Sequence, residues 1–290
     1  MNIDLNFENL ELRAIQYNAR QSVSDFDGCM AQYSTLAEQA KSSTAGIYDL
    51  HYGMGKAERL DLFPAAKQPA PLFVFIHGGY WHSQTKEDAC SMAYSFTQHN
   101  VALATLEYTL QPEATLAEIV REVRSAIAWL YHHSAQFGVD PERIFVGGSS
   151  AGGHLTGMLI ADDWQQSYRV PTNVIKGAIA LSGLFDIRPL CDIYINDWMR
   201  QIPEQAKLLS PLFLLPEVSH APKVLLSVGA KETCGFKNQT QAYYAACQDR
   251  GLDVQLIEDL EHNHFTLVNE LADPQSRMFE HVMAMIHPQS

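Results

Sequence analysis

The sequence predicts an α/β fold in which a mostly parallel central sheet carries helices on both faces. Short β-branched or apolar runs alternate with helix-length segments from residue 72 onward. Two of these runs, residues 72–77 and 101–108, are apolar over most of their length, as expected for buried strands. The chain has 290 residues, of which 47% are hydrophobic and 18% charged, so it can bury a large core.

The N-terminal part of the chain precedes this alternation. Residues 1–45 are polar and weakly patterned, which indicates an arm of helix and loops. Residues 47–52 and 59–63 alternate in polarity around Gly53 and Gly55, which is typical of an antiparallel hairpin.

The remaining elements follow from apolar periodicity. The clearest helix spans residues 115–137, where apolar side chains recur every three or four positions until Gly138 and Pro141 end the pattern. Further strands are expected at residues 72–77, 101–108, 143–147, 174–181, 223–228 and 254–257, and further helices at 88–99, 155–161, 236–250 and 267–286.

Residues 182–218 interrupt the alternation. This stretch contains four prolines and one short helical pattern around residues 194–200. A long insertion between strands is usually functional, so we expect a small cap or pocket wall here. No linker divides the chain, and we expect one domain over residues 1–290.

Composition excludes several classes of partner. The net charge of −13 disfavours nucleic acid and anionic membranes. No apolar run is long enough for a membrane span, and the N-terminus lacks the pattern of a signal peptide. Five scattered cysteines without a C-x-x-C pair indicate reduced thiols in a cytoplasmic protein. A small-molecule substrate is therefore expected, and assembly into a homo-oligomer is left open.

The motif with the clearest chemistry is Gly148-Ser-Ser-Ala-Gly152. It joins a predicted strand to a predicted helix, which is the setting of a G-x-S-x-G nucleophile turn. The two glycines leave room for a strained turn that exposes the hydroxyl of Ser150. A phosphate-binding loop is disfavoured, because no Gly-Lys-Ser/Thr follows.

A serine nucleophile needs a base and an acid, and both are expected beyond the carboxyl ends of strands. For the base, His264 follows the strand at residues 254–257, with His262 as its competitor. For the acid, Glu232 follows the strand at residues 223–228, and Asp186 is the second candidate. The order Ser150, Glu232, His264 is the one expected for this topology.

A turn suited to binding an oxyanion follows the strand at residues 72–77. In His77-Gly-Gly-Tyr-Trp81, the backbone N–H groups of Gly78, Gly79 and Tyr80 could join that of Ala151. A metal site is disfavoured, although His262 with His264, or His77 with His82, offers nitrogen ligands. No H-E-x-x-H motif or Cys/His cluster accompanies them, so we expect neither metal nor cofactor.

Taken together, these motifs resemble the α/β-hydrolase superfamily, and within it the kynurenine formamidase (arylformamidase) branch, close to the hormone-sensitive-lipase-like esterases. The similarity extends over most of the chain: the most specific parts are the Tyr-Trp ending of the 77–81 turn and residues 181–190, supported by residues 17–20, 49–53 and 264–265. Two positions depart from the family pattern. Ser149 replaces a histidine that is frequent before the nucleophile, and Glu232 stands where the eukaryotic formamidases carry aspartate.

The resemblance implies an α/β-hydrolase fold and a serine hydrolase that cleaves the N-formyl amide of an arylamine through an acyl-enzyme. The alternative is a broad small-acyl carboxylesterase with the same machinery. A catalytically silent interaction protein is disfavoured, because a complete candidate triad is present. Ser149, Trp81 and Asp186 are expected to belong to the substrate pocket, and the alternative for Asp186 is a structural role. Tyr80 and Trp81 could stack an aryl group or could equally be core residues.

Overall fold

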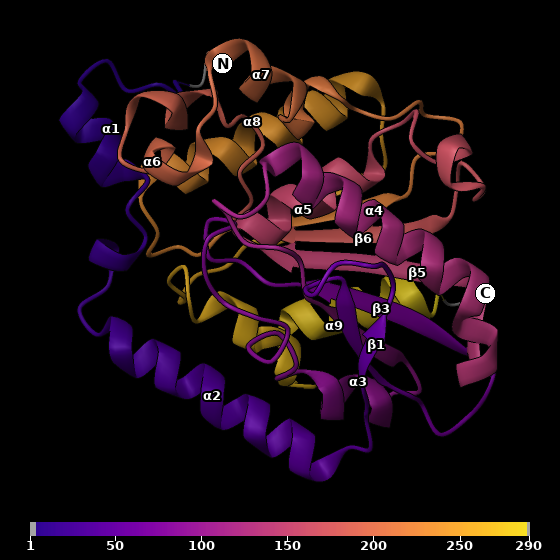
Figure 1. Cartoon of the computed structure of the whole chain (residues 1–290). Helices are drawn as coiled ribbons and strands as arrows, with labels where there is room; N and C mark the ends of the chain where they lie inside the picture. The colour runs from indigo at the N-terminus through magenta and orange to yellow at the C-terminus, as the bar shows by residue number, and fades with distance from the viewer. Residues whose placement is uncertain (1–3, 289–290) are drawn as a thin grey trace.

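A computed structural model describes residues 4–288 (Figure 1). Its strands form one eight-stranded sheet with the order β1-β2-β4-β3-β5-β6-β7-β8. The pairs β1–β2 and β2–β4 are antiparallel and the other pairs are parallel, so the predicted α/β class is confirmed. The strands are β1 (Ile47–His51), β2 (Arg59–Phe63), β3 (Ala70–Ile76), β4 (Ala102–Leu106), β5 (Val139–Ser149), β6 (Ile175–Leu181), β7 (Lys223–Ser227) and β8 (Val254–Leu256).

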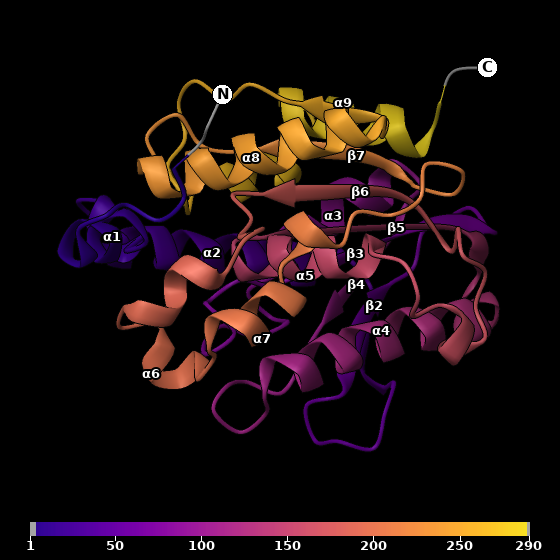
Figure 2. The ribbon, with the colours of Figure 1, turned by 90° about the horizontal axis from the view of Figure 1, so that it is seen from above.

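Helices cover both faces of this sheet. Figures 1 and 2 show α4, α5 and α8 on one face and α3 and α9 on the other. Among the described residues, no helix is both long enough and apolar enough to cross a membrane. The helices are α1 (Leu10–Gln16), α2 (Phe26–Ser43), α3 (Ala93–Gln98), α4 (Leu116–His133), α5 (Ala151–Ile160), α6 (Asn196–Met199), α7 (Pro203–Leu208), α8 (Cys234–Arg250) and α9 (Arg277–Ile286).

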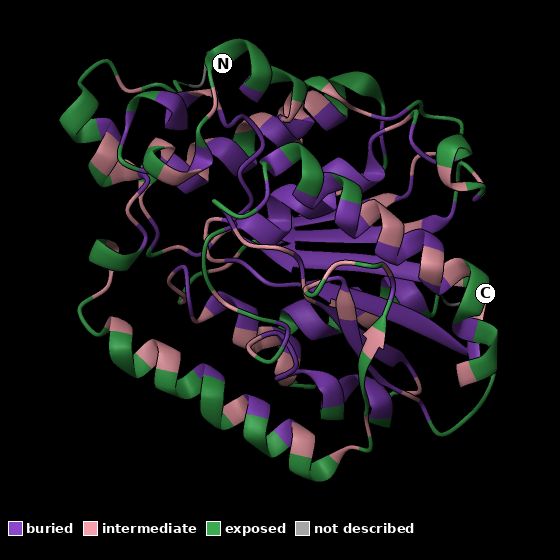
Figure 3. Ribbon diagram, in the orientation of Figure 1, coloured by how far each residue is buried: buried purple, intermediate pink, exposed green. Residues whose placement is uncertain are grey.

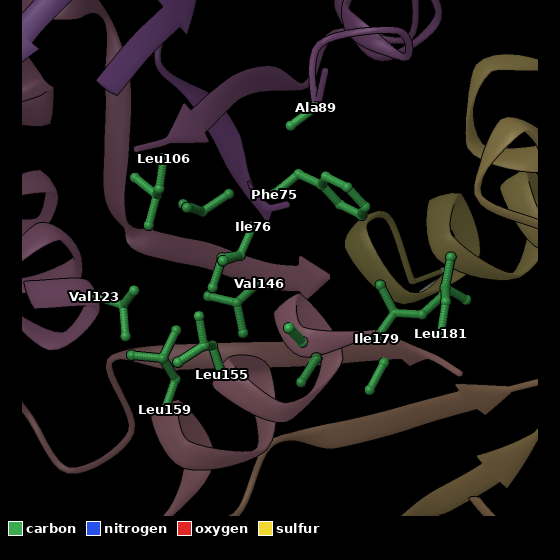
Figure 4. Packing of buried hydrophobic residues seen from close by; sticks show 14 of the residues in the cluster. Phe75, Ile76, Ala89, Leu106, Val123, Val146, Leu155, Leu159, Ile179 and Leu181 are labelled. Carbon is green, nitrogen blue, oxygen red and sulfur yellow. The ribbon is translucent and has the colours of Figure 1, made fainter. Parts of the chain in front are cut away.

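The core lies where the central strands meet the helices. Every residue of β3 and β4 is buried, as Figure 3 shows for the middle of the sheet. In Figure 4, Leu155 and Leu159 of α5 face Val146 of β5, with Val123 of α4 beside them. Burying a leucine side chain contributes roughly 1.5–3 kcal/mol, so this contact fixes α5, and with it the turn that precedes α5.

The N-terminal arm predicted for residues 1–45 contains α1 and α2, although its first three residues lie outside the described part of the chain. Helix α1 lies beyond the carboxyl ends of the strands, and α2 runs from that side toward α3 (Figure 1). Tyr17, at the end of α1, is fully buried. Its hydroxyl donates to the Leu5 carbonyl at 2.9 Å and accepts from Gln239 Nε2 at 3.0 Å. These contacts tie the arm to α8.

Three elements differ from the sequence prediction. The last helix is interrupted: a 3₁₀ turn covers Leu267–Ala272 and α9 begins only at Arg277. Pro274 lies between the two, and a proline disfavours helix at the residue before it. Helix α3 is shorter than predicted and begins at Ala93. The insertion at residues 182–218 contains 3₁₀ turns as well as α6 and α7.

The packing of α5 leads to a stability prediction. Leu155→Ala leaves a cavity in the core and is expected to lower the free energy of unfolding by about 2–5 kcal/mol in urea titration. Leu208→Ala is the control, because the Leu208 side chain is 70% exposed. Equal losses in the two variants would contradict this account of the core.

Candidate active site

The strand-to-helix turn around Ser150 has the strained geometry that its glycines predict. Ser150 stands between β5 and α5 with φ 59° and ψ −117°. A Cβ at Gly148 would collide with the backbone of Gly152, and a Cβ at Gly152 would collide with the Ile76 carbonyl of β3. The N–H of Ser150 donates to the Leu181 carbonyl at 2.8 Å, which holds the turn against β6. Only glycine fits at both flanking positions.

The structure brings Glu232, rather than Asp186, to His264. His264 follows β8 and Glu232 follows β7, and His264 Nδ1 lies 2.6 Å from Glu232 Oε2. Both side chains are buried. By contrast, the Asp186 carboxylate binds Arg188 Nη2 at 2.6 Å. The competing base, His262, contacts Asp259 instead: its Nδ1 lies 2.5 Å from Asp259 Oδ1.

Ser182 is a site residue that the sequence reasoning missed. It follows β6, is fully buried, and donates its hydroxyl to Glu232 Oε1 at 2.5 Å. The N–H of Gly229 donates to the same oxygen at 2.7 Å. One carboxylate oxygen is therefore held by two donors while the other faces His264. The position of Ser182 directly after a buried strand was the available signal.

The turn at residues 78–81 lies directly beside the serine. A Cβ at Gly78 would be 3.3 Å from Ser150 Cβ. Within residues 4–288, the backbone N–H groups of Gly79, Tyr80 and Ala151 donate to no protein acceptor. The N–H of Gly78, in contrast, donates to Gln84 Oε1 at 3.0 Å. Three of the four expected oxyanion donors are therefore free, and Gly78 is engaged within the protein.

Buried polar contacts hold the start of this turn. His77 stacks on Tyr108 with ring centroids 4.2 Å apart, and its Nε2 lies 3.2 Å from Glu107 Oε1. The Tyr108 hydroxyl donates to the Gly78 carbonyl at 3.1 Å. His77 is thus occupied in positioning the turn.

Tyr80 connects the turn to two distant parts of the chain. Its hydroxyl donates to the Tyr17 carbonyl of the N-terminal arm at 2.5 Å. Its own carbonyl accepts from Trp198 Nε1, in α6 of the insertion, at 3.1 Å. Burial raises the pKa of the Tyr80 phenol well above its ordinary value, so it stays protonated and remains a donor.

Trp81 does not belong to the pocket, contrary to the expectation from sequence. It has φ 58°, is fully buried, and packs edge-to-face on His154 of α5 with ring centroids 4.9 Å apart. Burial lowers the pKa of His154 to about 4, so its imidazole is neutral at pH 7. Tyr80 lines the cavity beside Ser150 whereas Trp81, the next residue, lies in the core. Asp186 is also absent from the cavity wall.

Ser150 and His264 open on a common cavity of about 630 Å³. Tyr194 and Trp198 of the insertion contribute one part of its wall, as the sequence predicted for residues 182–218. The N-terminal arm contributes another part, which was not anticipated. The arm residues on the wall are Asn18, Ala19, Arg20, Phe26, Met30 and Tyr33, and Ser149 and Phe265 also line the cavity. The last three arm residues recur at helical spacing, so a periodicity search of α2 could have revealed this face.

Within residues 4–288, no group of three or more His, Cys, Asp or Glu side chains lies close enough together to hold a metal ion.

Comparison with known proteins agrees with this geometry. Residues 60–242 match the BD-FAE family model, which is more than half of the chain. The chain belongs to the BD-FAE family. A kynurenine formamidase from Danio rerio is 28% identical over 96% of this chain and 96% of its own length. An isoprenylcysteine alpha-carbonyl methylesterase from Arabidopsis thaliana is 24% identical over 81% of this chain and 61% of its own length.

The fold is shared with solved structures as well. The crystal structure of a candidate thioesterase from Silicibacter sp. superposes with a TM-score of 0.80, at 26% identity, over 94% of this chain and 97% of that one. The α/β-hydrolase fold is confirmed, and this member of the BD-FAE family is a hydrolase.

The contact between Ser182 and Glu232 generates a prediction. Ser182→Ala removes one donor from a buried carboxylate and is expected to lower kcat about tenfold or more. The loss should appear in kcat rather than in KM, because Ser182 holds the carboxylate that contacts His264 and does not line the cavity. Steady-state kinetics would measure both constants.

Ser227→Ala is the matched control for this variant. Ser227 is equally buried, and its hydroxyl donates to the Ile257 carbonyl at 2.9 Å, away from Glu232. Ser227→Ala should lose stability but keep its kcat. An equal loss of kcat in both variants would show that Ser182 acts only through the fold.

Proposed function

We propose that this hydrolase cleaves the N-formyl amide of an arylamine, such as N-formylkynurenine, through a formyl-enzyme. The observation that carries the proposal is that the strained Ser150 and His264 line one cavity with aromatic walls. Behind His264, its Nδ1 lies 2.6 Å from Glu232 Oε2. The full-length similarity to a kynurenine formamidase supports the choice of a formamide. Aromatic walls suit an aryl leaving group, because offset and edge-to-face ring contacts are favourable.

The first half of the reaction makes the formyl-enzyme. The Ser150 oxygen attacks the formyl carbon while His264 Nε2 takes the hydroxyl proton. The former carbonyl oxygen carries the negative charge, and the free N–H groups of Gly79, Tyr80 and Ala151 are placed to bind it. The C–N bond then breaks, and His264 returns the proton to the arylamine nitrogen.

The second half restores the enzyme. Water attacks the formyl carbon of the ester on Ser150, with His264 as the general base. Formate leaves, and the Ser150 oxygen recovers its proton from His264. Throughout, Glu232 accepts the Nδ1–H of His264, which selects the tautomer in which Nε2 faces Ser150 and stabilises the imidazolium as it forms.

A broad carboxylesterase for small acyl groups is the alternative. The similarity to a methylesterase favours it, and the same residues would perform ester hydrolysis. The two readings differ in the substrate, not in the machinery.

We also infer that the enzyme acts in the cytoplasm and binds no nucleic acid. All five cysteines are free, as expected under reducing conditions, and the net charge of −13 repels phosphate backbones.

Substrate comparison tests the proposed activity. The purified protein is expected to turn over N-formylkynurenine with a kcat/KM above that for p-nitrophenyl acetate, because the cavity holds an aryl leaving group. Turnover of the ester without turnover of the formamide would refute the formamidase proposal and support the carboxylesterase alternative. Ser150→Ala is the control that shows the chemistry belongs to this site.

A matched pair of variants tests the acid. Glu232→Ala should lower kcat about 10⁴-fold, because His264 then loses the group that orients it. Asp186→Ala removes an equally buried carboxylate whose partner is Arg188, so it should cost stability and less than about tenfold in kcat. A larger loss of kcat in Asp186→Ala would reverse the assignment.

A further inference from the structure

An unpaired cation stands on the wall of the cavity. Arg20 lies in the 3₁₀ turn that joins α1 to α2, and its side chain is exposed. Its guanidinium carbon lies 4.5 Å from the centroid of the Phe26 ring. Within residues 4–288, Arg20 forms neither an ion pair nor a side-chain hydrogen bond. Stacking on the ring face restrains the guanidinium while its N–H groups stay available at the edge.

An unpaired anion lines the same cavity. Asp88 is half-buried, and its Oδ2 accepts from the Thr85 N–H at 3.0 Å. Over the described residues, its Oδ1 accepts no hydrogen bond and the carboxylate has no cationic partner. The nearby Lys86 binds Asp61 at 2.9 Å and is fully buried there. The charge of Asp88 is therefore left for a ligand.

An aromatic wall connects the cation to the candidate catalytic base. The Phe26 ring packs edge-to-face on Phe265, with centroids 5.1 Å apart, and Phe265 packs likewise on His264 at 5.3 Å. Two phenyl rings thus separate the Arg20 guanidinium from the His264 imidazole. An aryl group lying along this wall would place one end at Ser150 and a side arm toward Arg20.

We propose that Arg20 and Asp88 form a subsite for an α-amino-acid side arm on the aryl leaving group. Arg20 binds the carboxylate, which matches the planar fork of a guanidinium, and Asp88 accepts from the ammonium. The subsite rests on the proposed hydrolysis of aryl formamides, and it specifies that the substrate class is zwitterionic. In a chain with a net charge of −13, a free cation on the cavity wall is where a carboxylate would bind.

The test uses a series of four aryl formamides: formanilide, an analogue with only the carboxylate, an analogue with only the amine, and N-formylkynurenine. Arg20→Gln is expected to lower kcat/KM for the two carboxylate-bearing members, relative to formanilide, by about tenfold or more. Asp88→Asn keeps an oxygen that can accept from the Thr85 N–H. It should lower kcat/KM for the two amine-bearing members relative to formanilide. Arg20→Lys should give an intermediate loss, because an ammonium lacks the bidentate fork.

Arg277→Gln is the matched control. Arg277 is an exposed arginine of α9 outside the cavity wall, so the four ratios should not change. If Arg20→Gln lowers all four rates equally, Arg20 only supports the wall. If the ratios do not change in Arg20→Gln or in Asp88→Asn, the subsite does not exist.

The same series built as aryl acetates separates this inference from the proposed function. A protein that hydrolyses the acetates but none of the formamides would refute the formamidase activity. The effect of Arg20→Gln and Asp88→Asn on kcat/KM for the charged acetates, relative to the uncharged acetate, would then still test the subsite. A smaller preference for the charged substrates at high salt would show that the selectivity is electrostatic.

Discussion

The close approach of three backbones at the Ser150 turn is the constraint on which the rest of the site depends. Helix α5 can begin directly after β5 only because residues 148 and 152 lack side chains and the Ile76 carbonyl of β3 fills that space. Ile76 also immediately precedes the turn at residues 77–81. One steric contact therefore places Ser150, the proposed nucleophile, beside the proposed oxyanion donors, and the burial of Leu155 and Leu159 holds α5 in place. The strain at Ser150 is supported by the core beneath it.

The other half of the site depends on hydrogen bonds between loops. Ser182 and Gly229 donate to one oxygen of Glu232 and His264 contacts the other, so residues that follow β6, β7 and β8 all contribute to the proposed acid–base pair. Removing one donor from such a network is destabilising. A buried carboxylate that loses a hydrogen-bond donor costs more free energy than an exposed carboxylate that loses one.

Much of the cavity wall lies outside the sheet. The Tyr80 side chain binds the N-terminal arm through Tyr17, and its carbonyl binds the insertion through Trp198. The arm and the insertion thus meet at the turn at residues 77–81, and both line the cavity. A change in either segment can alter the pocket while the Ser150 turn stays intact.

The sequence by itself determined the fold class and most of the strands, because apolar runs between turn residues report burial directly. It also identified Ser150 and His264 as candidates, since the glycine spacing and the position after a strand are local signals. Only the tertiary structure showed that Glu232, and not Asp186, contacts His264. It also placed Trp81 in the core, and it brought Ser182 to Glu232 and one face of α2 to the cavity wall. Those outcomes depend on which side chains meet across strands β6 to β8 and across the arm. Contacts between residues far apart in the chain leave no periodic pattern in one sequence.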